Sequence, residues 1–307
     1  MLTAPTTSSP SIGTLGLTVD SVNKRVKMLS DHVFNKNTEI VHYLYNTVKD
    51  NPLAIALLND PIARFTARVI VKANTVAKLN PFPLANGLVV HEEARIRIKG
   101  YEIIYIGGNR EARFDHAEFE QEKQLAQKYT NLEPTNTDSC YATFCRLTEV
   151  TQKDIDELLE MYGLCFDSYL VPLDEELMRS AARNSIFYVA RNSDGVIVAS
   201  AIGESLQLGP LTLVEISEVA AHPILRIRGG ATGCVKRVIE ESKRTLSGHV
   251  VIFMEARMWQ NILGMCQTVG LKVFAGILHQ HCIISSGDEF TSIPQEKYGS
   301  LAICYVP

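Results

Sequence analysis

The sequence has no apolar run of the length that a membrane span needs. A transmembrane helix requires about 18 or more consecutive apolar residues, and runs such as 53–58 are far shorter. The first residues lack a basic start followed by an apolar stretch, so a secretory signal is not expected. We therefore expect a cytoplasmic protein without a membrane segment, beginning with a flexible tail over residues 1–15.

Paired cysteines are also lacking. The seven cysteines include no Cys-x-x-Cys pair and lie mostly within apolar segments. This usage is typical of reduced core residues rather than of a disulfide scaffold. His279 and His281 alternate on an expected strand, but no acidic or cysteine partner stands near them at ligand spacing. We therefore expect no metal site.

The chain has little excess charge, and what it has is negative. Its formal net charge is −4, with 46% hydrophobic and 21% charged residues. Because nucleic-acid-binding domains present broad basic surfaces, a nucleic acid is not an expected partner. The composition is instead that of globular proteins with a sizeable core, and 307 residues suffice for two domains.

A polar, proline-containing stretch at 131–139 divides the chain. Before it we expect a smaller, diverged α/β domain at 16–135, and after it a second α/β domain at 136–307. In the second domain, apolar periodicity predicts the order β-α-α-β-β-β-α-β-α-β, which indicates a mixed sheet flanked by helices. These elements are expected over 141–147, 151–166, 172–183, 186–204 (a hairpin), 211–223, 231–244, 249–257, 258–270 and 271–285.

Residues 222–233, HPILRIRGGATG, lie between an expected strand and an expected helix. The unpaired N–H groups and the positive end of the dipole at a helix N-terminus attract phosphate groups. Gly229 and Gly230 would let a pyrophosphate approach the backbone closely, and Arg226 and Arg228 would supply fork-shaped cationic donors. The stretch therefore predicts a pyrophosphate site. The alternative is a solvated pair of surface arginines.

Two other nucleotide-binding motifs are absent. A P-loop requires Gly-Lys-Ser/Thr, and a dinucleotide fold requires glycines near a first βα unit with an acidic residue about 20 positions on. Neither pattern occurs. The spacing Arg226-x-x-Gly229-x-Ala231, after a strand that contains Glu215 and Glu218, resembles the acetyl-CoA loop of the GNAT N-acetyltransferases. The expected order of elements resembles that fold as well.

A narrower resemblance, to the β-lysine N-acetyltransferase family, is carried loosely by nearly the whole chain. Its segments are FDSYLVPLDEELMRSAARNSIFYVARNSDG, EISEVAAHPILRIRGGATG and VGLKVFAGILHQHCII, with 23–29, 67–74 and 86–114 resembling that family's amino-terminal domain. The resemblance implies that an acetyl group passes from acetyl-CoA to the amine of a small amino acid such as β-lysine by direct attack. In one departure, Cys266 stands where many GNAT enzymes carry a tyrosine that acts as general acid.

The same resemblance implies the site residues. Glu218 is the expected general base, because it stands on the strand just before the backbone that should hold the acetyl group, and Glu215 is the second choice. Residues three apart on a strand face opposite sides, so at most one of the two should face the cleft unless a bulge intervenes. A bulge would also free an N–H near Ala220 or Ala221 to polarise the thioester carbonyl. Tyr169 and His281 are expected substrate contacts. The expected cofactor-binding residues are Val219, Ala220, Ala221, Arg226, Ile227, Arg228, Gly229, Gly230, Ala231 and Thr232.

Three classes of function remain open for the sequence. They are a small-molecule amine N-acetyltransferase, a protein or peptide N-acetyltransferase, and a non-catalytic acyl-CoA-binding protein. Acidic residues in a nearly closed acceptor cleft would favour the first class, and an open groove the second. Glu218 as a purely structural carboxylate is the alternative to its role as base. The N-terminal domain is expected to pack beside the second domain, cover its cleft or support a homodimer.

Overall fold

The computed structural model describes residues 15–21, 24–113, 115–130, 142–166, 173–271, 273–285 and 296–306. Nearly all of the expected tail, the expected linker and Tyr169 therefore lie outside the described residues. Among the helices that the structure describes, none is long and apolar enough to cross a membrane.

The described strands form one 13-stranded mixed sheet with the order β1-β2-β3-β6-β5-β12-β13-β11-β10-β9-β8-β7, and β4 pairs with β5 beside this path. The strands are β1 (Gly16–Asp20), β2 (Arg25–Phe34), β3 (Arg64–Lys72), β4 (Phe82–Pro83), β5 (Val89–Ile98), β6 (Tyr101–Asn109), β7 (Thr143–Leu147), β8 (Ile186–Arg191), β9 (Ile197–Leu208), β10 (Leu211–Ala221), β11 (His249–Arg257), β12 (Val273–Ser285) and β13 (Glu296–Tyr305). The helices are α1 (Asn37–Lys49), α2 (Pro52–Leu58), α3 (His116–Thr130), α4 (Gln152–Cys165), α5 (Glu175–Asn184), α6 (Gly230–Thr245) and α7 (Gln260–Val269).

The sheet contains one five-strand arrangement twice. In the N-terminal half the neighbours run β1-β2-β3-β6-β5, and in the C-terminal half they run β9-β10-β11-β13-β12. Each arrangement has one parallel pair, β2 with β3 or β10 with β11, and its other pairs are antiparallel. A helical crossover joins each parallel pair, α1 and α2 in the first unit and α6 in the second. We call these the N-terminal unit and the C-terminal unit.

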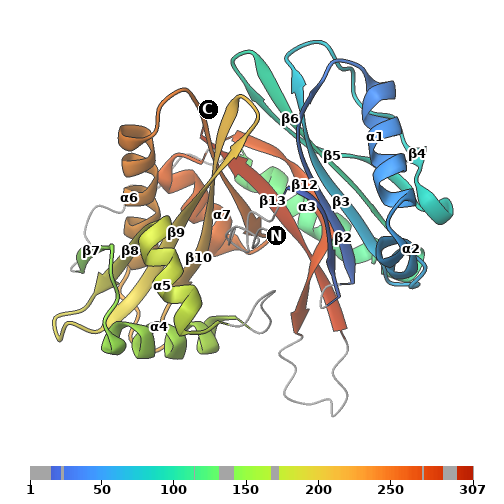
Figure 1. Ribbon diagram of the computed structural model, residues 1–307. Helices are drawn as coiled ribbons and strands as arrows, with labels where there is room; N and C mark the ends of the chain where they lie inside the picture. Colours follow the sequence, from blue (N-terminus) through green and yellow to red (C-terminus); the bar gives the residue numbers. More distant parts are fainter. Residues whose placement is uncertain are drawn as a thin grey trace, which may run out of the picture.

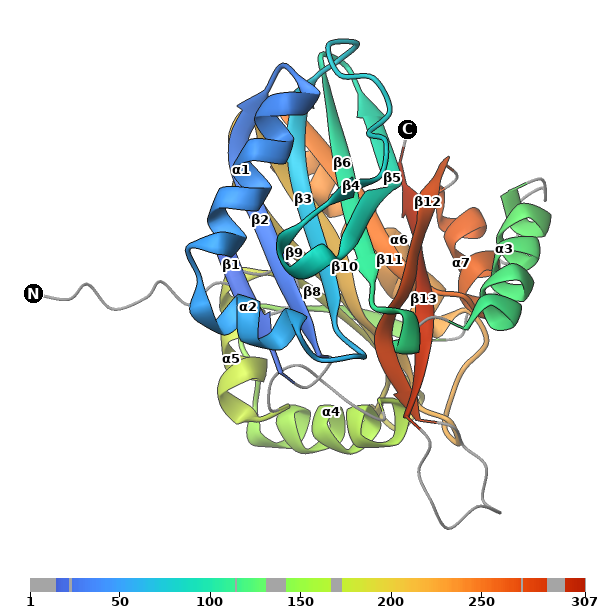
Figure 2. The same ribbon diagram turned by 90° about the vertical axis from the view of Figure 1, so that its right-hand side faces the viewer.

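The two units pack face to face, with their helices outside (Figures 1 and 2). Helices α1 and α2 cover the outer face of the N-terminal unit, and α6 and α7 cover that of the C-terminal unit. The inner faces meet in a buried apolar cluster in which Ile70 and Tyr105 of the first unit pack with Leu213 and Phe253 of the second. Helices α4 and α5 cover the remaining inner face beside β8 and β9.

The fold class predicted from the sequence is confirmed. The order β7-α4-α5-β8-β9-β10-α6-β11-α7-β12 follows the prediction for 136–307, and β13 adds a strand. Thr151 caps α4 through a capping box with Asp154. Strand β2 was missed because its charged residues, such as Arg25, break the apolar pattern that marks a strand. Arg25 is 3% exposed, because Asp20 neutralises it at 2.6 Å.

The predicted domain division stays a prediction, because residues 131–141 are outside the described part of the chain. The two halves share the sheet and the inner apolar cluster. Helix α3 adds a further link, since its Ala126 is buried in the core that α6 and α7 form with the C-terminal unit.

The sheet passes from one unit to the other where Gly276 of β12 pairs with Ala94 of β5. Gly276 has φ 152°, and a Cβ there would lie 2.3 Å from the carbonyl oxygen of Glu93 and 2.6 Å from Cα of Ala94. Because both atoms belong to the backbone, neither can move aside cheaply. We expect Gly276→Ala to lower the free energy of unfolding by about 2 kcal/mol, measured by urea denaturation.

Gly248→Ala is the matched control. Gly248 also has positive φ, 86°, but nothing lies within 4 Å of the position that a Cβ would occupy there. The substitution should therefore cost only the backbone strain, about 1 kcal/mol. Equal losses of unfolding free energy at the two positions would show that the close approach of Gly276 to β5 contributes nothing to stability.

Candidate active site

The parallel strands β10 and β11 separate part of the way along their length. They pair from Leu211 with His249 as far as Glu215 with Phe253, although β10 continues to Ala221 and β11 to Arg257. The pairing of β10 with β9 shifts register between Ser217 and Ala220. This is the bulge that the resemblance implied. It turns β10 away from β11 and opens the sheet between the two strands.

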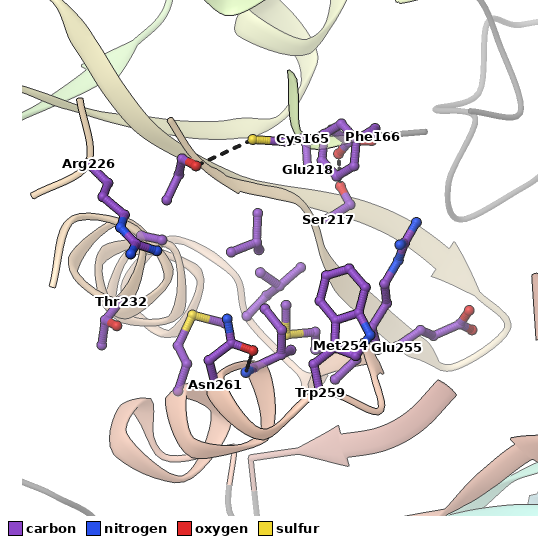
Figure 3. Close-up of a pocket in the computed structure, with 18 of the residues that line it drawn as sticks. Cys165, Phe166, Ser217, Glu218, Arg226, Thr232, Met254, Glu255, Trp259 and Asn261 are labelled. Carbon is purple, nitrogen blue, oxygen red and sulfur yellow. Dashed lines mark hydrogen bonds between the residues drawn. The ribbon is translucent and has the colours of Figure 1, made fainter. Parts of the chain in front are cut away.

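A cavity of about 510 Å³ occupies this opening (Figure 3). Its walls come from the end of α4, the second half of β10, the start of α6, the end of β11 and the first turns of α7. Figure 3 shows Arg226 and Thr232 at one side of it, and Glu218, Phe166 and Trp259 at the other. The volume is within the range of about 300–1,000 Å³ that small-molecule sites occupy.

The first of these two sides is built by the turn that leads into α6. Gly229 precedes the helix with φ 81°, a left-handed conformation that favours glycine. Gly230 is buried, and a Cβ on it would lie 3.3 Å from Cβ of Ala199, so the helix start packs tightly on β9. Nδ1 of His222 accepts hydrogen bonds from the N–H groups of Ile224 and Leu225 at 3.2 and 3.1 Å, which holds the turn.

The predicted cofactor residues divide into two groups at this place. Arg226 is exposed and lines the cavity, and so do Val219, Ala221, Ala231 and Thr232. Five others are not among its lining residues: Ala220, Ile227, Arg228, Gly229 and Gly230. Of these, Arg228 is exposed, whereas Ala220 belongs to the core beneath α4 and α5.

Glu218 lies on the second side, at the bulge. It has φ 43° and is 7% exposed. The Ser217 hydroxyl donates a hydrogen bond to its Oε2, and the Ser200 hydroxyl donates to its main-chain oxygen at 2.9 Å. Burial raises the pKa of Glu218 from 4.5 to about 8. A carboxyl group with such a pKa suits proton transfer near neutral pH.

Glu215 lies elsewhere. It is 5% exposed, does not line the cavity, and accepts a hydrogen bond at 3.1 Å from Nη1 of Arg68 in the N-terminal unit. Burial raises its pKa to about 7, against the opposing effect of Arg68. The bulge thus places Glu218 at the cavity and leaves Glu215 against the other unit.

Glu255 lines the cavity from β11 and was missed by the sequence reasoning. It stands in the strand HVVIFMEAR, which is otherwise largely apolar. A single carboxylate inside such a strand was the signal that could have found it. It is also linked to His281, whose Nε2 lies 3.9 Å from Oε2 of Glu255. His281 itself is 3% exposed and is not among the lining residues.

Cys266, which the resemblance placed where a general acid would stand, is buried and does not line the cavity. Its thiol contacts the sulfur of Met254 at 3.7 Å. The neighbouring Cys304 and burial raise the pKa of this thiol well above 9. In this position Cys266 is a core residue, and the leaving group of an acyl transfer would take its proton from solvent or another side chain.

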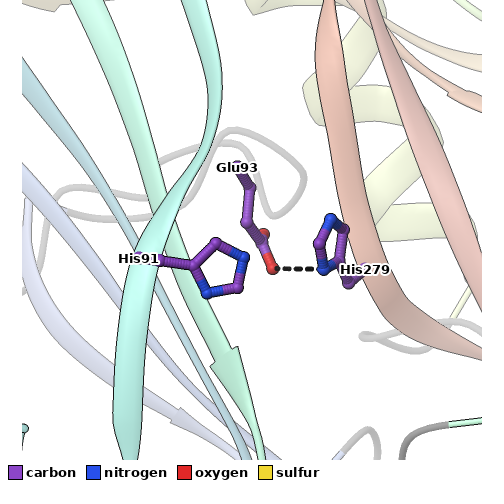
Figure 4. Close-up of side chains that lie close together, drawn as sticks. All are labelled: His91, Glu93 and His279. Atoms are coloured by element: carbon purple, nitrogen blue, oxygen red, sulfur yellow. Dashed lines mark ion pairs between the residues drawn. The ribbon is translucent and has the colours of Figure 1, made fainter. Parts of the chain in front are cut away.

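His91, Glu93 and His279 form a cluster between β5 and β12 (Figure 4). Potential metal-ligand atoms of the three lie within 4.8 Å of one another, and Nδ1 of His279 is 3.8 Å from Oε1 of Glu93. Both oxygens of Glu93, however, accept hydrogen bonds from Arg64. A metal ion here would therefore lie close to a guanidinium. The sequence reasoning missed Glu93 as a neighbour of His279 because the two residues are far apart along the chain. The expected absence of a metal stays a prediction.

No protein-family model matches the chain, and no curated protein sequence matches it significantly. Among solved structures, it is similar to a GNAT superfamily phosphinothricin acetyltransferase from Sinorhizobium meliloti in complex with AcCoA, at 13% identity, with 54% of this chain and 88% of that chain covered and a TM-score of 0.42. It is also similar to the ribosomal-protein-S18-alanine N-acetyltransferase from Escherichia coli (13% identity, 54% and 93% covered, TM-score 0.38). A third is a Bacillus subtilis acetyltransferase in complex with CoA (16% identity, 54% and 97% covered, TM-score 0.38).

Proposed function

We propose that the chain is an acetyl-CoA-dependent N-acetyltransferase that acts on the amine of a small amino acid such as β-lysine. One observation carries the proposal. A single cavity in the opened sheet has the start of α6 with Arg226 on one side and a buried carboxyl group, Glu218, on the other. Such a cavity offers a place for a pyrophosphate and a base for an amine.

The residues on the α6 side fit the pyrophosphate of acetyl-CoA. Gly229 presents no Cβ, so a phosphate can approach the N–H groups of the first helical turn. The Arg226 guanidinium lines the cavity wall and supplies charge-assisted hydrogen bonds. Thr232 lines the same wall. The backbone and the side chains at this helix start therefore both suit the binding of an anionic group.

The residues on the other side fit an attack by an amine. Acetyl-CoA supplies a thioester carbonyl, and the bulge leaves β10 without its β11 partner, so N–H groups near Ala220 and Ala221 are candidates for polarising that carbonyl. A lysine-like amine has a pKa near 10.4 and arrives protonated. Glu218 removes that proton, directly or through water, and the amine nitrogen forms a bond to the carbonyl carbon. The carbon–sulfur bond then breaks, the nitrogen releases its second proton to solvent, and the thiolate takes up a proton from solvent.

The cavity that Glu218 lines also has acidic and aromatic residues among its lining. Glu255 adds a second carboxylate, while Phe166 and Trp259 add aromatic surface. This combination suits a cationic acceptor with an aliphatic chain. Transfer to a protein or peptide amine is the alternative within the same chemistry, and acyl-CoA binding without catalysis is the alternative outside it.

The first test is the release of free thiol from acetyl-CoA with a panel of amines: β-lysine, lysine, ornithine, spermidine and a lysine peptide. We expect selective turnover of β-lysine or another small diamino acid. Turnover of the peptide alone would indicate that the acceptor is a protein and not a small molecule. Acetyl-CoA binding without turnover of any amine would favour the non-catalytic class, and absence of acetyl-CoA binding would reject the proposal.

A further inference from the structure

The N-terminal unit reaches the cavity through a buried arginine. Arg68 lies on β3, and its Nη1 donates a hydrogen bond at 3.1 Å to Oε2 of Glu215. Its Nη2 donates to Oε1 of Glu255, a residue that lines the cavity. Both acceptors belong to the C-terminal unit. The same guanidinium thus binds one glutamate that does not line the cavity and one glutamate that does.

The position of Arg68 is tightly determined. The guanidinium carbon lies 5.3 Å from the ring centre of Tyr105 in its own unit and 5.3 Å from that of Phe253 in the other. The side chain of Arg68 is 8% exposed. A planar cation held between two rings, with two carboxylates on its fork, has few alternative orientations. It therefore fixes where the carboxylate of Glu255 lies.

Glu255 keeps the capacity to bind a second cation. Its Oε1 is taken by Arg68, but its Oε2 faces Nε2 of His281 at 3.9 Å, which is beyond hydrogen-bond distance. Burial and nearby arginines lower the pKa of His281 well below 6.5, so this imidazole is neutral at pH 7. Arg68 is shared between the carboxylates of Glu215 and Glu255. Lys27 is a further buried cation that interacts with both glutamates, and burial lowers its pKa to about 8.

We infer that Glu255, positioned by Arg68 of the N-terminal unit, binds the ammonium group of a diamino acceptor that is not acetylated. The inference rests on the proposed function, because it places the acceptor on the Glu218 side of the cavity. Arg257 lines the same side, with its guanidinium 5.0 Å from the ring centre of Trp259, and is available for the acceptor's carboxylate. Glu255 is then a specificity-determining residue, and Arg68 is a positioning residue that acts through it.

The experiment compares two substrates that differ by one amino group. β-Lysine and 6-aminohexanoate share the chain, the carboxylate and the terminal amine, and only β-lysine carries the second ammonium. We would measure kcat and KM for both, together with the Kd of acetyl-CoA, in the wild type, Glu255→Gln, Arg68→Lys and Arg97→Gln. Arg97 is the matched control, since it is a charged residue of the same unit whose side chain is 72% exposed.

We expect the wild type to prefer β-lysine by roughly ten-fold or more in kcat/KM, the value of one hydrogen bond to a charged group. Glu255→Gln should abolish that preference through KM for β-lysine, leaving KM for 6-aminohexanoate and the Kd of acetyl-CoA unchanged. Arg68→Lys should lose a large part of the preference, because an ammonium cannot reproduce the fork on two carboxylates. Arg97→Gln should keep all of it. If Arg68→Lys does not fold, Arg68→Met, apolar like its ring neighbours, is the second variant.

The contrary outcomes are distinct. A wild type that turns over both substrates equally, or a Glu255→Gln variant that keeps the preference, overturns the role of Glu255. Full preference in a folded Arg68 variant overturns the positioning role. Failure of the wild type to bind acetyl-CoA overturns the proposed function itself. Acetyl-CoA binding without turnover of either substrate overturns the diamino acceptor but leaves the cofactor site standing.

Discussion

Glu218→Gln should lower kcat by about a hundred-fold or more and leave the affinity for acetyl-CoA unchanged. Removal of a positioned general base typically costs two to four orders of magnitude in rate. The amide is nearly the same size as the carboxylic acid, so it fills the same buried position beside Ser217 but accepts no proton. Steady-state thiol release with β-lysine gives kcat, and calorimetry with acetyl-CoA gives the affinity.

The pH dependence of the rate gives an independent test of the same residue. Burial raises the pKa of Glu218 to about 8, so the carboxyl group is largely protonated at pH 7. A base acts only after losing its proton, and the wild-type rate should therefore rise through about pH 8 and then level off. In Glu218→Gln this rise should be absent. The control is Glu240→Gln, an exposed carboxylate on α6, which should leave both the rate and its pH profile unchanged.

The raised pKa of Glu218 also makes the stability of the folded protein fall as the pH rises. A carboxyl group whose pKa is higher in the folded than in the unfolded protein binds its proton more tightly when folded. Its contribution is complete below about pH 4.5 and is lost as the pH rises through about 8. The wild type should therefore lose stability relative to Glu218→Gln over that interval.

A pH profile of the rate that is identical in the wild type and Glu218→Gln would remove Glu218 as the base.

Local signals in the sequence were sufficient to predict part of the fold and part of the candidate site. The turn at Gly229 and the helix that follows it depend on a few consecutive residues, and the sequence predicted them within one or two positions. The bulge near Glu218 followed from the resemblance of that strand to a known one. These features are local, so a single stretch of chain contains the information for them.

The missed features depend on partners distant in sequence. Arg68 and Glu255 are 187 positions apart, and only the packing of one unit on the other brings them into contact. The repeat of one strand arrangement in the two halves was missed for a similar reason. Its first copy contains strand β2, in which buried charges such as Arg25 replace the apolar residues that a sequence pattern requires. Ion pairs between strands compensate these charges, and such pairs cannot be read from a pattern along one strand.

Arg226→Glu should weaken acetyl-CoA binding by about a hundred-fold. A charge-assisted hydrogen bond contributes about 1.5–3 kcal/mol, and reversing the charge adds repulsion of the pyrophosphate. The side chain is exposed and lines the cavity beside the start of α6, so the change should not disturb the core. The affinity of the wild type for acetyl-CoA should also fall at high salt, because exposed charges are screened.

Gly229→Val tests the backbone of the same site. Gly229 has φ 81°, which a β-branched residue adopts only under strain, and the added side chain would stand where a phosphate approaches the helix. We expect a loss of affinity comparable to that of Arg226→Glu. Lys236→Glu is the matched control, since it reverses an exposed charge on α6 away from the cavity. If calorimetry finds wild-type affinity in both Arg226→Glu and Gly229→Val, the start of α6 does not bind the pyrophosphate. Equal losses in Arg226→Glu and Lys236→Glu would attribute the effect of the arginine to net charge rather than to this site.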